Sequence, residues 1–298
     1  MTEGADRVSE ASNEKRGILY LVSLPIGNLQ DITLRALDTL RSVDFILAED
    51  TRHTRRLLSH FQIETPFFSS LYQGAERQRI PMIVARLLEG RTLALVSDAG
   101  TPLISDPGFP LVRAVVEHGI PVVPIPGASA GLAALVASGL PTDRFLFVGL
   151  MPRKIGDRRS LIEQWNDEAT TIVAYESPHR LVSTLEALAA LLPDRPVVLA
   201  RELTKVHEEF LRGTSDELLQ LLASRDEVRG ECVLVIGPST SAHERRTAAD
   251  DTRLLDALRD EGLTDRTIAR VFALVTGRSK NEAYREIQEA RRGASAVD

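Results

Sequence analysis

The chain has 298 residues, of which 43% are hydrophobic and 26% charged, and its formal net charge is −6 at pH 7. A chain of this length is too long for one ordinary core, so it predicts a soluble globular protein of two domains and an appendage. The net charge argues against a surface that attracts nucleic acid everywhere, although it allows a local basic surface. The single cysteine excludes a disulfide framework and a cysteine-based zinc site. The six histidines are scattered without the spacing of metal ligands, so we expect no metal and a cytoplasmic protein.

The first 16 residues are polar and charged, and they predict a disordered tail rather than a secretory signal. Residues 119–142 carry no charge and are long enough to span a membrane. Prolines and glycines interrupt this segment repeatedly, however, and such a segment makes a poor lipid-exposed helix. It predicts a short strand, a turn and a buried helix, so we expect no contact with a membrane.

Short apolar runs alternate with helical patterns over residues 17–141. This alternation predicts an α/β domain with right-handed crossovers and a parallel sheet. The expected strands are residues 18–22, 45–48, 92–96 and 122–125, and the expected helices are residues 34–40, 55–61, 80–88, 109–118 and 130–137.

Residues 142–237 predict a second α/β domain, in which the shorter spacings favour a mixed sheet. Its expected strands are residues 145–150, 171–175, 196–200 and 231–236, and its expected helices are residues 181–192 and 218–222.

A polar linker over residues 238–250 precedes a predicted helical domain over residues 251–292. Its helical patterns are residues 254–258, 267–274 and 282–290, the last opened by a capping box over residues 279–282. These patterns are typical of a helix-turn-helix domain, and a small bundle that only packs on the body or on a dimer partner is an equal alternative.

Polar clusters follow the expected strands, and the richest is Ser97-Asp98-Ala99-Gly100-Thr101-Pro102-Leu103-Ile104-Ser105-Asp106-Pro107-Gly108. Glycine lets the backbone approach a ligand, and a carboxylate after a parallel strand lies where open α/β sheets bind ligands. The plain alternative is a tight turn with a capping Asp. The other clusters are residues 25–28, 49–54, 176–180 and 201–205. We expect the clusters of the first half to converge and the other two to face them across a cleft. The absence of a Gly-x-Gly-x-x-Gly motif and of a Walker loop disfavours a standard nucleotide-binding fold.

Five stretches in order resemble the ribosomal RNA small subunit methyltransferase I family of the tetrapyrrole methylase superfamily. They are residues 24–32, Ala48-Glu49-Asp50-Thr51-Arg52-His53-Thr54, residues 97–108, Tyr175-Glu176-Ser177-Pro178-His179-Arg180 and Arg201-Glu202-Leu203-Thr204-Lys205. The resemblance covers residues 17–237, and the C-terminal helices resemble the family's helix-turn-helix domain. It implies two α/β domains with S-adenosylmethionine (SAM) in the cleft between them, and a homodimer. The implied reaction is 2′-O-methylation of a cytidine in the decoding centre of small-subunit (16S) rRNA, free or in an assembled 30S subunit.

Methyl transfer from a sulfonium needs an in-line approach and a site that tolerates the positive sulfur. On the resemblance and these requirements, we expect the cofactor to be bound by Pro25, Asp98, Gly100, Thr101, Ile104, Ser129 and Ala130. A ribose hydroxyl needs a base or a nearby cation, for which the candidates are Glu49, Asp50, Lys154 and Lys205. The expected RNA contacts are Arg52, His53, Arg153, Arg158, Arg159, Arg180 and Arg201.

Each cluster also has a structural alternative. The acids at 49 and 50 with Arg52 could form an ion-paired helix entry, and Arg201 could pair with Glu202. Arg55 and Arg56 are most simply a solvated helix face. The alternative functions are methylation of a porphyrinoid or of a protein side chain on the same fold, and a ligand-sensing regulator that binds DNA. The mixed charges of residues 251–298 argue against the regulator.

Overall fold

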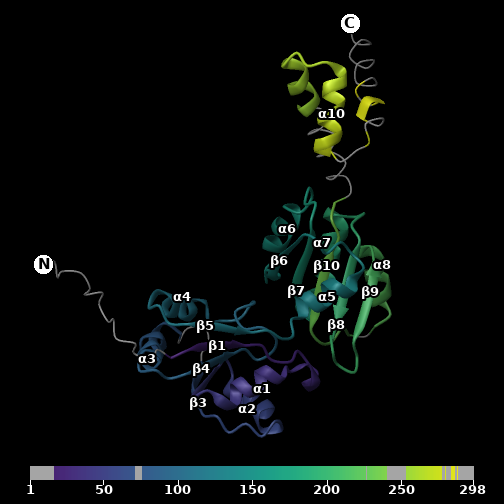
Figure 1. Ribbon diagram of the computed structural model, residues 1–298. Helices are drawn as coiled ribbons and strands as arrows, with labels where there is room; N and C mark the ends of the chain where they lie inside the picture. The colour runs from purple at the N-terminus through teal and green to yellow at the C-terminus, as the bar shows by residue number, and fades with distance from the viewer. Residues whose placement is uncertain are drawn as a thin grey trace, which may run out of the picture.

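The computed structural model describes residues 17–70, 76–225, 227–239, 253–276, 279, 283–285 and 287. Two five-stranded sheets dominate this part of the chain, and a small group of helices follows them (Figure 1). Within the described ranges, no helix combines the length and the apolar character that crossing a membrane requires. The predicted tail and most of the predicted linker lie outside the described residues.

The N-terminal sheet is parallel throughout, with the strand order β3-β2-β4-β1-β5. Its strands are β1 (Leu19–Val22), β2 (Phe45–Ala48), β3 (Phe67–Ser70), β4 (Leu93–Val96) and β5 (Val122–Ile125). Side chains alternate between the two faces of such strands, so Leu93 and Leu95 enter one core cluster while Ala94 and Val96 enter another. The parallel sheet predicted from the sequence is confirmed, although strand β3 was not among the predicted elements.

Helices cover both faces of this sheet. They are α1 (Leu34–Ser42), α2 (Thr51–His60), α3 (Glu76–Leu88) and α4 (Phe109–Glu117), with a short 3-10 turn η1 (Leu29–Asp31). Helix α2 begins four residues before the predicted start at Arg55. The Asp50 side chain accepts a hydrogen bond from the Arg52 backbone N–H at 2.8 Å, which caps the helix at its first turn.

The C-terminal sheet is mixed, with the strand order β6-β7-β10-β8-β9. Strands β6 and β7 are parallel and the other pairs are antiparallel, which confirms the predicted mixed sheet. The strands are β6 (Phe145–Leu150), β7 (Thr171–Glu176), β8 (Val197–Arg201), β9 (Glu209–Gly213) and β10 (Cys232–Ile236). Helices α6 (Ile155–Glu163), α7 (Pro178–Leu191) and α8 (Ser215–Ala223) contribute to the core on one face. Strand β9, like β3, was not among the predicted elements.

Helix α5 (Ala130–Ser138) couples the two halves of the chain. It precedes the boundary expected near residue 141, yet its Ala134 and Leu135 share a core cluster with Val173 of the C-terminal sheet. Arg212 of β9 also donates hydrogen bonds of 2.7 and 3.2 Å to two carbonyls at the end of α5. Helix α5 therefore begins beside the N-terminal sheet and covers the second face of the C-terminal sheet.

The helix of residues 253–260 and helix α10 (Asp265–Thr276) pack around the buried Phe272 in a core of their own. Ala283 and Ile287 complete that core, whereas residues 280–282 of the predicted capping box lie outside the described residues. The α/β class with one parallel and one mixed sheet is thus confirmed, and the helix-turn-helix identity of the last helices stays a prediction.

Candidate active site

A cavity of about 370 Å³ lies between loops from the two sheets. This volume is typical of a pocket for a small molecule or cofactor. Residues 99–106 and the start of α5 form one wall, and residues 175–178 and 230–233 form the other. We call it the donor cavity. Five of the seven predicted cofactor-binding residues line it, namely Gly100, Thr101, Ile104, Ser129 and Ala130.

The loop that carries Gly100 is held by hydrogen bonds to two neighbouring loops. Gly100 and Leu24 exchange backbone hydrogen bonds of 2.8 and 3.0 Å. The Thr101 hydroxyl accepts from Ser23 at 3.1 Å and donates to the Ala128 carbonyl at 3.2 Å. Gly100 has a φ of +71°, and a Cβ there would come within 3.3 Å of Ile26, so the position favours glycine and keeps the cavity wall thin.

Backbone strain concentrates in two loops, of which the one after β4 lines the donor cavity and the one after β8 reaches the neighbouring loop of Gly27. Among the described residues, five other than glycine have a positive φ, and four of them lie in these loops. Leu103 and Ser105 lie in the first loop, and Glu202 and Thr204 lie in the loop after β8. Each such conformation costs on the order of 1–3 kcal/mol and is found mainly at functional sites. The positive φ values in the first loop accompany its position along the cavity wall.

The charged residues that line the donor cavity are all acids. Among its described lining residues, Asp106, Glu176 and Glu231 carry carboxylates, and none is Lys, Arg or His. Burial raises the pKa of Asp106, Asp98 raises it further, and a hydrogen bond from Ser97 opposes both effects. Glu176 is ion-paired with Arg180 and Glu231 with Lys205, which leaves Asp106 as the carboxylate of the three without a cation partner among the described residues. This one acid in a largely apolar cavity suits a ligand that carries positive charge on an apolar body.

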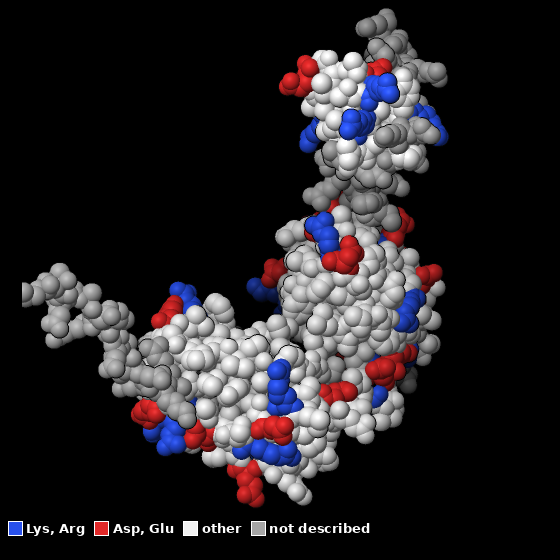
Figure 2. Space-filling model, in the orientation of Figure 1, with Lys and Arg blue, Asp and Glu red and all other residues white. Residues whose placement is uncertain are grey.

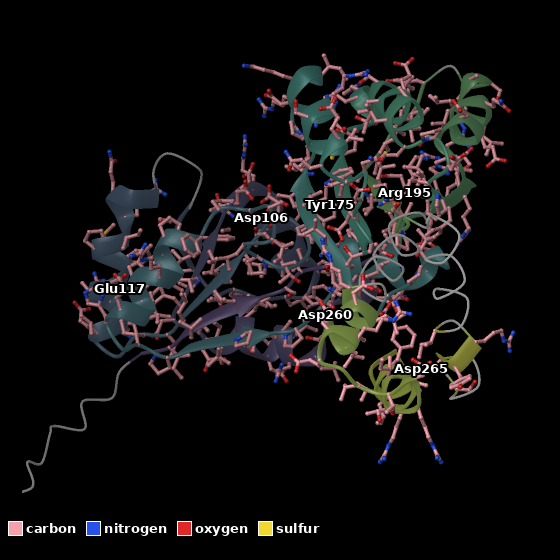
Figure 3. All side chains as sticks on the ribbon, turned by 90° about the horizontal axis from the view of Figure 1, so that it is seen from above. Asp106, Glu117, Tyr175, Arg195, Asp260 and Asp265 are labelled. Carbon is pink, nitrogen blue, oxygen red and sulfur yellow. The ribbon has the colours of Figure 1, made fainter. Side chains whose placement is uncertain are left out.

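Tyr175 faces Asp106 at the junction between the two halves of the molecule (Figure 3). Its hydroxyl accepts a hydrogen bond of 3.2 Å from the Gly131 backbone N–H, at the first turn of α5. Burial raises the pKa of Tyr175, so the hydroxyl stays protonated near neutral pH. Tyr175 thus fixes the start of α5 against strand β7 and holds that wall of the cavity in place.

A second cavity, of about 420 Å³, meets the donor cavity at Ile26, Ala99 and Glu231. We call it the acceptor cavity. The remaining predicted cofactor-binding residues, Pro25 and Asp98, line this cavity and not the donor cavity. The seven predicted residues therefore do not line one cavity, and Asp98 and Gly100 lie on different sides of the shared residue Ala99. Their role in binding the cofactor stays a prediction.

The two neighbouring acids Glu49 and Asp50 differ in their surroundings. Burial raises the pKa of Glu49, and the negative charges of Asp106, Asp98 and Asp50 raise it further. Asp50 instead accepts hydrogen bonds from Arg52, including an ion pair of 2.7 Å, which lowers its pKa to about 2. This pair is the ion-paired helix entry that the sequence left open. Of the two acids, Glu49 is therefore the one with the raised pKa, although it is not among the residues that line either cavity.

The predicted basic loop around residue 154 is largely helical. Helix α6 begins at Ile155, and Lys154 is its N-cap residue. Arg158 is only 3% exposed, and its guanidinium donates to two carbonyls of the preceding turn at 3.1 Å and to Ser183 at 2.8 Å. The expectation that Arg158 contacts phosphate is therefore wrong, since its donors hold the turn together. Arg153, Lys154 and Arg159 are exposed.

Two other predicted RNA contacts are ion-paired within the second half. Arg180 pairs at 2.8 Å with Glu176, whose carboxylate is fully buried. Arg201 pairs at 3.1 Å with Glu209 of the neighbouring strand and not with Glu202, as the sequence had suggested. Both arginines are partly buried, which leaves little of either guanidinium for a phosphate.

The structure brings together residues that the sequence reasoning did not select. Asp106, Tyr175 and Glu231 line the donor cavity, and Arg56 and His60 line the acceptor cavity. The helical spacing of His53, Arg56 and His60 was a signal that could have identified the last two.

Comparisons with known proteins agree with this geometry. The family described as Tetrapyrrole (Corrin/Porphyrin) Methylases matches residues 18–219. A protein of Micromonospora olivasterospora called Ribosomal RNA small subunit methyltransferase I is 43% identical over 97% of this chain and 94% of its own length. One of that name from Haemophilus influenzae is 45% identical over 90% of this chain and 95% of its own length.

Among solved structures, a Thermus thermophilus uroporphyrin-III C-methyltransferase complexed with S-adenosylhomocysteine has a TM-score of 0.50. It is 20% identical, and the match covers 74% of this chain and 97% of that one, which shows a shared fold. The predicted fold type is thereby confirmed. With a family match over most of its length and close relatives that bear one name, the chain belongs to the tetrapyrrole methylases, in the ribosomal RNA small subunit methyltransferase I group.

Proposed function

We propose that this chain transfers the methyl group of SAM to the 2′-hydroxyl of a cytidine ribose in the decoding centre of small-subunit rRNA. The observation that carries the proposal is the meeting of two unlike cavities at Ala99. The donor cavity is lined by acids and apolar groups, whereas the acceptor cavity has basic side chains. The names of the relatives support rRNA as the substrate, and a cytoplasmic site of action follows from that substrate.

The donor cavity fits SAM in size and in charge. A positive sulfur is stabilised by nearby carboxylates such as Asp106 and Glu231, and the thin wall at Gly100 allows close backbone contact. Thr101, Ser129 and Ala130 would hold the nucleoside and the amino acid portion through backbone groups. Bound there, SAM supplies an electrophilic methyl group, and the protein supplies alignment.

Glu49 is the general base in this proposal. Its raised pKa improves it as a proton acceptor, and it interacts with one acid from each cavity, Asp106 and Asp98. Asp50, with a pKa of about 2, is a much weaker base. Burial would lower the pKa of Lys205, but hydrogen bonds to Glu202 and Glu231 raise it above its ordinary value. Lys205 is therefore a fixed cation that can stabilise the developing alkoxide, and the exposed Lys154 contacts RNA.

Contacts to the rest of the RNA, free or in an assembled 30S subunit, are proposed at the exposed Arg153 and Arg159 near the start of α6. On the face drawn in Figure 2, Lys and Arg stand beside Asp and Glu and form no continuous basic surface. Local contacts of this kind agree with the net charge of −6.

We also propose that the chain works as a homodimer. Large apolar side chains are exposed on helices α4 and α5, with Phe109 66%, Leu132 51% and Val136 73% exposed. An apolar surface of this kind is typical of a protein interface. Sedimentation of the wild type and of Val136→Glu tests this: the wild type should sediment as a dimer, and a monomeric wild type would contradict it.

The reaction itself is tested with labelled SAM and small ribosomal subunits from cells that lack this enzyme. Nuclease digestion and mass spectrometry should find the label on a single 2′-O-methylcytidine of the decoding centre. Label on a base nitrogen or on protein would contradict the proposed acceptor and support another substrate for the same fold. Absence of label in subunits and free rRNA would contradict rRNA as the substrate.

A further inference from the structure

Helix α2 presents a basic stripe to the acceptor cavity. His53, Arg56 and His60 are spaced three and four residues apart, which places them on one helix face, and all three line the cavity. A helix that packs on a sheet usually turns apolar side chains inward at such positions. Here Leu57 and the buried Leu58 provide that packing, and the stripe faces a space instead. The spacing and the cavity together indicate a binding surface.

Arg56 differs from the other arginines of this helix. Arg52 is ion-paired with Asp50, and Arg55 lies over the ring of Phe67 at 5.5 Å. Arg56 has no ion pair or hydrogen bond within the described part of the chain. A cation that lines a cavity without a protein partner is available to an anionic ligand.

Asp98 lines the same cavity and has one carboxylate oxygen available. Its Oδ1 accepts a hydrogen bond of 3.1 Å from the Asp50 backbone N–H. Its Oδ2 accepts no hydrogen bond from the described residues. A carboxylate oxygen in this state pairs well with an amino group, such as that of cytosine.

The position of the acceptor cavity restricts which ligand it can bind. Methyl transfer requires that donor and acceptor meet, and the acceptor cavity shares Ile26, Ala99 and Glu231 with the donor cavity. A further cavity, of about 450 Å³, also adjoins the donor cavity, but none of its described lining residues is charged. An RNA phosphate needs cations, so the basic cavity is the one that fits.

We propose that the acceptor cavity binds the target nucleotide of the RNA, with the stripe of His53, Arg56 and His60 on its phosphate and Asp98 on the amino group of its base. This inference rests on the proposed function, because it assigns a place to that reaction's acceptor. It makes Arg56 a phosphate-binding residue and Asp98 a residue that selects cytosine over uracil.

Cytidine 5′-monophosphate and uridine 5′-monophosphate are the probes, titrated into the protein saturated with S-adenosylhomocysteine and followed by the NMR signals of the histidine rings. Arg56→Gln should weaken the binding of cytidine monophosphate about tenfold and should leave the affinity for SAM unchanged. The matched control is Arg55→Gln, one residue away on another face, which should bind both as the wild type does. Asp98→Asn should reduce the preference for cytidine over uridine monophosphate.

Equal affinities of Arg56→Gln and Arg55→Gln for cytidine monophosphate would overturn the assignment, as would unchanged signals of His53 and His60 on addition of the probe. Retained SAM affinity in each variant shows that the fold is intact. If wild-type protein methylates no rRNA but binds the probe through Arg56, the proposed reaction fails while the cavity assignment stands. If it methylates rRNA and Arg56→Gln does so with an unchanged KM, the assignment fails while the reaction stands.

Discussion

Lys205 lies directly against Gly27, so that a Cβ at residue 27 would come within 2.5 Å of Lys205 Cγ. Gly27 follows β1 of the N-terminal sheet and Lys205 follows β8 of the C-terminal sheet, so the contact joins the two halves beside the acceptor cavity. The Nζ atom is held by Glu202 at 2.8 Å and by Glu231 at 3.2 Å. The position of the proposed cation therefore depends on the absence of a side chain in the opposite loop.

Gly27→Ala should displace Lys205 and reduce methyl transfer. The new methyl group would also approach Lys205 Cε at 2.9 Å, so the long side chain must move away from its two carboxylates. A misplacement of about 1 Å near the reacting atoms can cost about 100-fold, and we expect kcat/KM to fall by roughly 10- to 100-fold. The control is Gly156→Ala, because a Cβ there meets nothing within 4 Å and alanine favours the helix. A Gly27→Ala enzyme with normal kcat/KM would show that the placement of Lys205 is not important.

Glu49→Gln should lower kcat by about 10²- to 10⁴-fold, the usual contribution of a general base, with the affinity for SAM unchanged. Burial and the neighbouring acids raise the pKa of Glu49 above its ordinary 4.5. Since the base acts when deprotonated, wild-type kcat should fall as the pH drops through that raised pKa, and the variant should lose this dependence. Asp50→Asn should have a smaller effect, because its pKa of about 2 makes it a poor base and Asn also caps helices. Near-normal turnover by Glu49→Gln would remove it from this role.

The residues in the wall of the donor cavity could be predicted from the sequence, because a glycine or a turn directly after a strand can be recognised from the neighbouring residues alone. Gly100 follows the buried strand β4 and Ser129 follows the edge strand β5, and the carboxyl ends of parallel strands meet at one edge of the sheet. The direction of the Asp98 side chain was not predictable, since it depends on the turn at Ala99. Arg158 was mistaken for a surface residue because charge composition does not reveal burial, which here follows from the carbonyls its guanidinium reaches.

Strands β3 and β9 were not predicted from the sequence, and the same physical features explain both cases. Both are edge strands of their sheets, so each pairs with a single neighbour. Their sequences, Phe67–Ser70 and Glu209–Gly213, mix polar and apolar residues without the continuous apolar run of a buried parallel strand. These segments are strands because they pair with another strand of the sheet, and not because their own sequence has a strand-like hydrophobic pattern.

Glu209→Gln should destabilise the protein in a pH-dependent way. Arg225 donates two hydrogen bonds to Glu209, at 2.6 and 2.8 Å, and Arg201 donates one at 3.1 Å. These interactions lower the pKa of Glu209 from 4.5 to about 2. Because the folded pKa is depressed, the stabilisation is complete above the unfolded value and is lost as the pH falls toward the folded value.

We therefore expect the variant to lose on the order of 1–3 kcal/mol at pH 7, and the difference to shrink as the pH falls from about 4.5 toward 2. Urea unfolding across this range measures it. Glu227→Gln is the matched control, because its ion pair with Arg229 is largely exposed and contributes little. A deficit that stayed constant with pH would contradict the role of the Glu209 charge.

Arg195 offers a test of stability that is separate from catalysis, since it lines neither the donor cavity nor the acceptor cavity. It is buried, and its guanidinium donates to the carbonyls of Gly237 at 2.7 Å, Trp165 at 3.1 Å and Glu168 at 3.2 Å. Burial lowers the pKa of Arg195, although an arginine remains charged at neutral pH.

Arg195→Met keeps the volume but leaves the Gly237 carbonyl without a donor, whereas the Trp165 and Glu168 carbonyls keep backbone donors from Glu168 and Ser239. The change should cost about 1–3 kcal/mol and lower the melting temperature by roughly 3–10 °C. Arg195→Lys should cost less, because an ammonium group can still donate to one of the carbonyls. Below its melting temperature, each variant should bind SAM as the wild type does. Equal melting temperatures for the wild type and the two variants would mean that these hydrogen bonds do not stabilise the C-terminal sheet. A loss of SAM affinity in the folded variants would mean that the sheet transmits the effect of the substitution to the donor cavity.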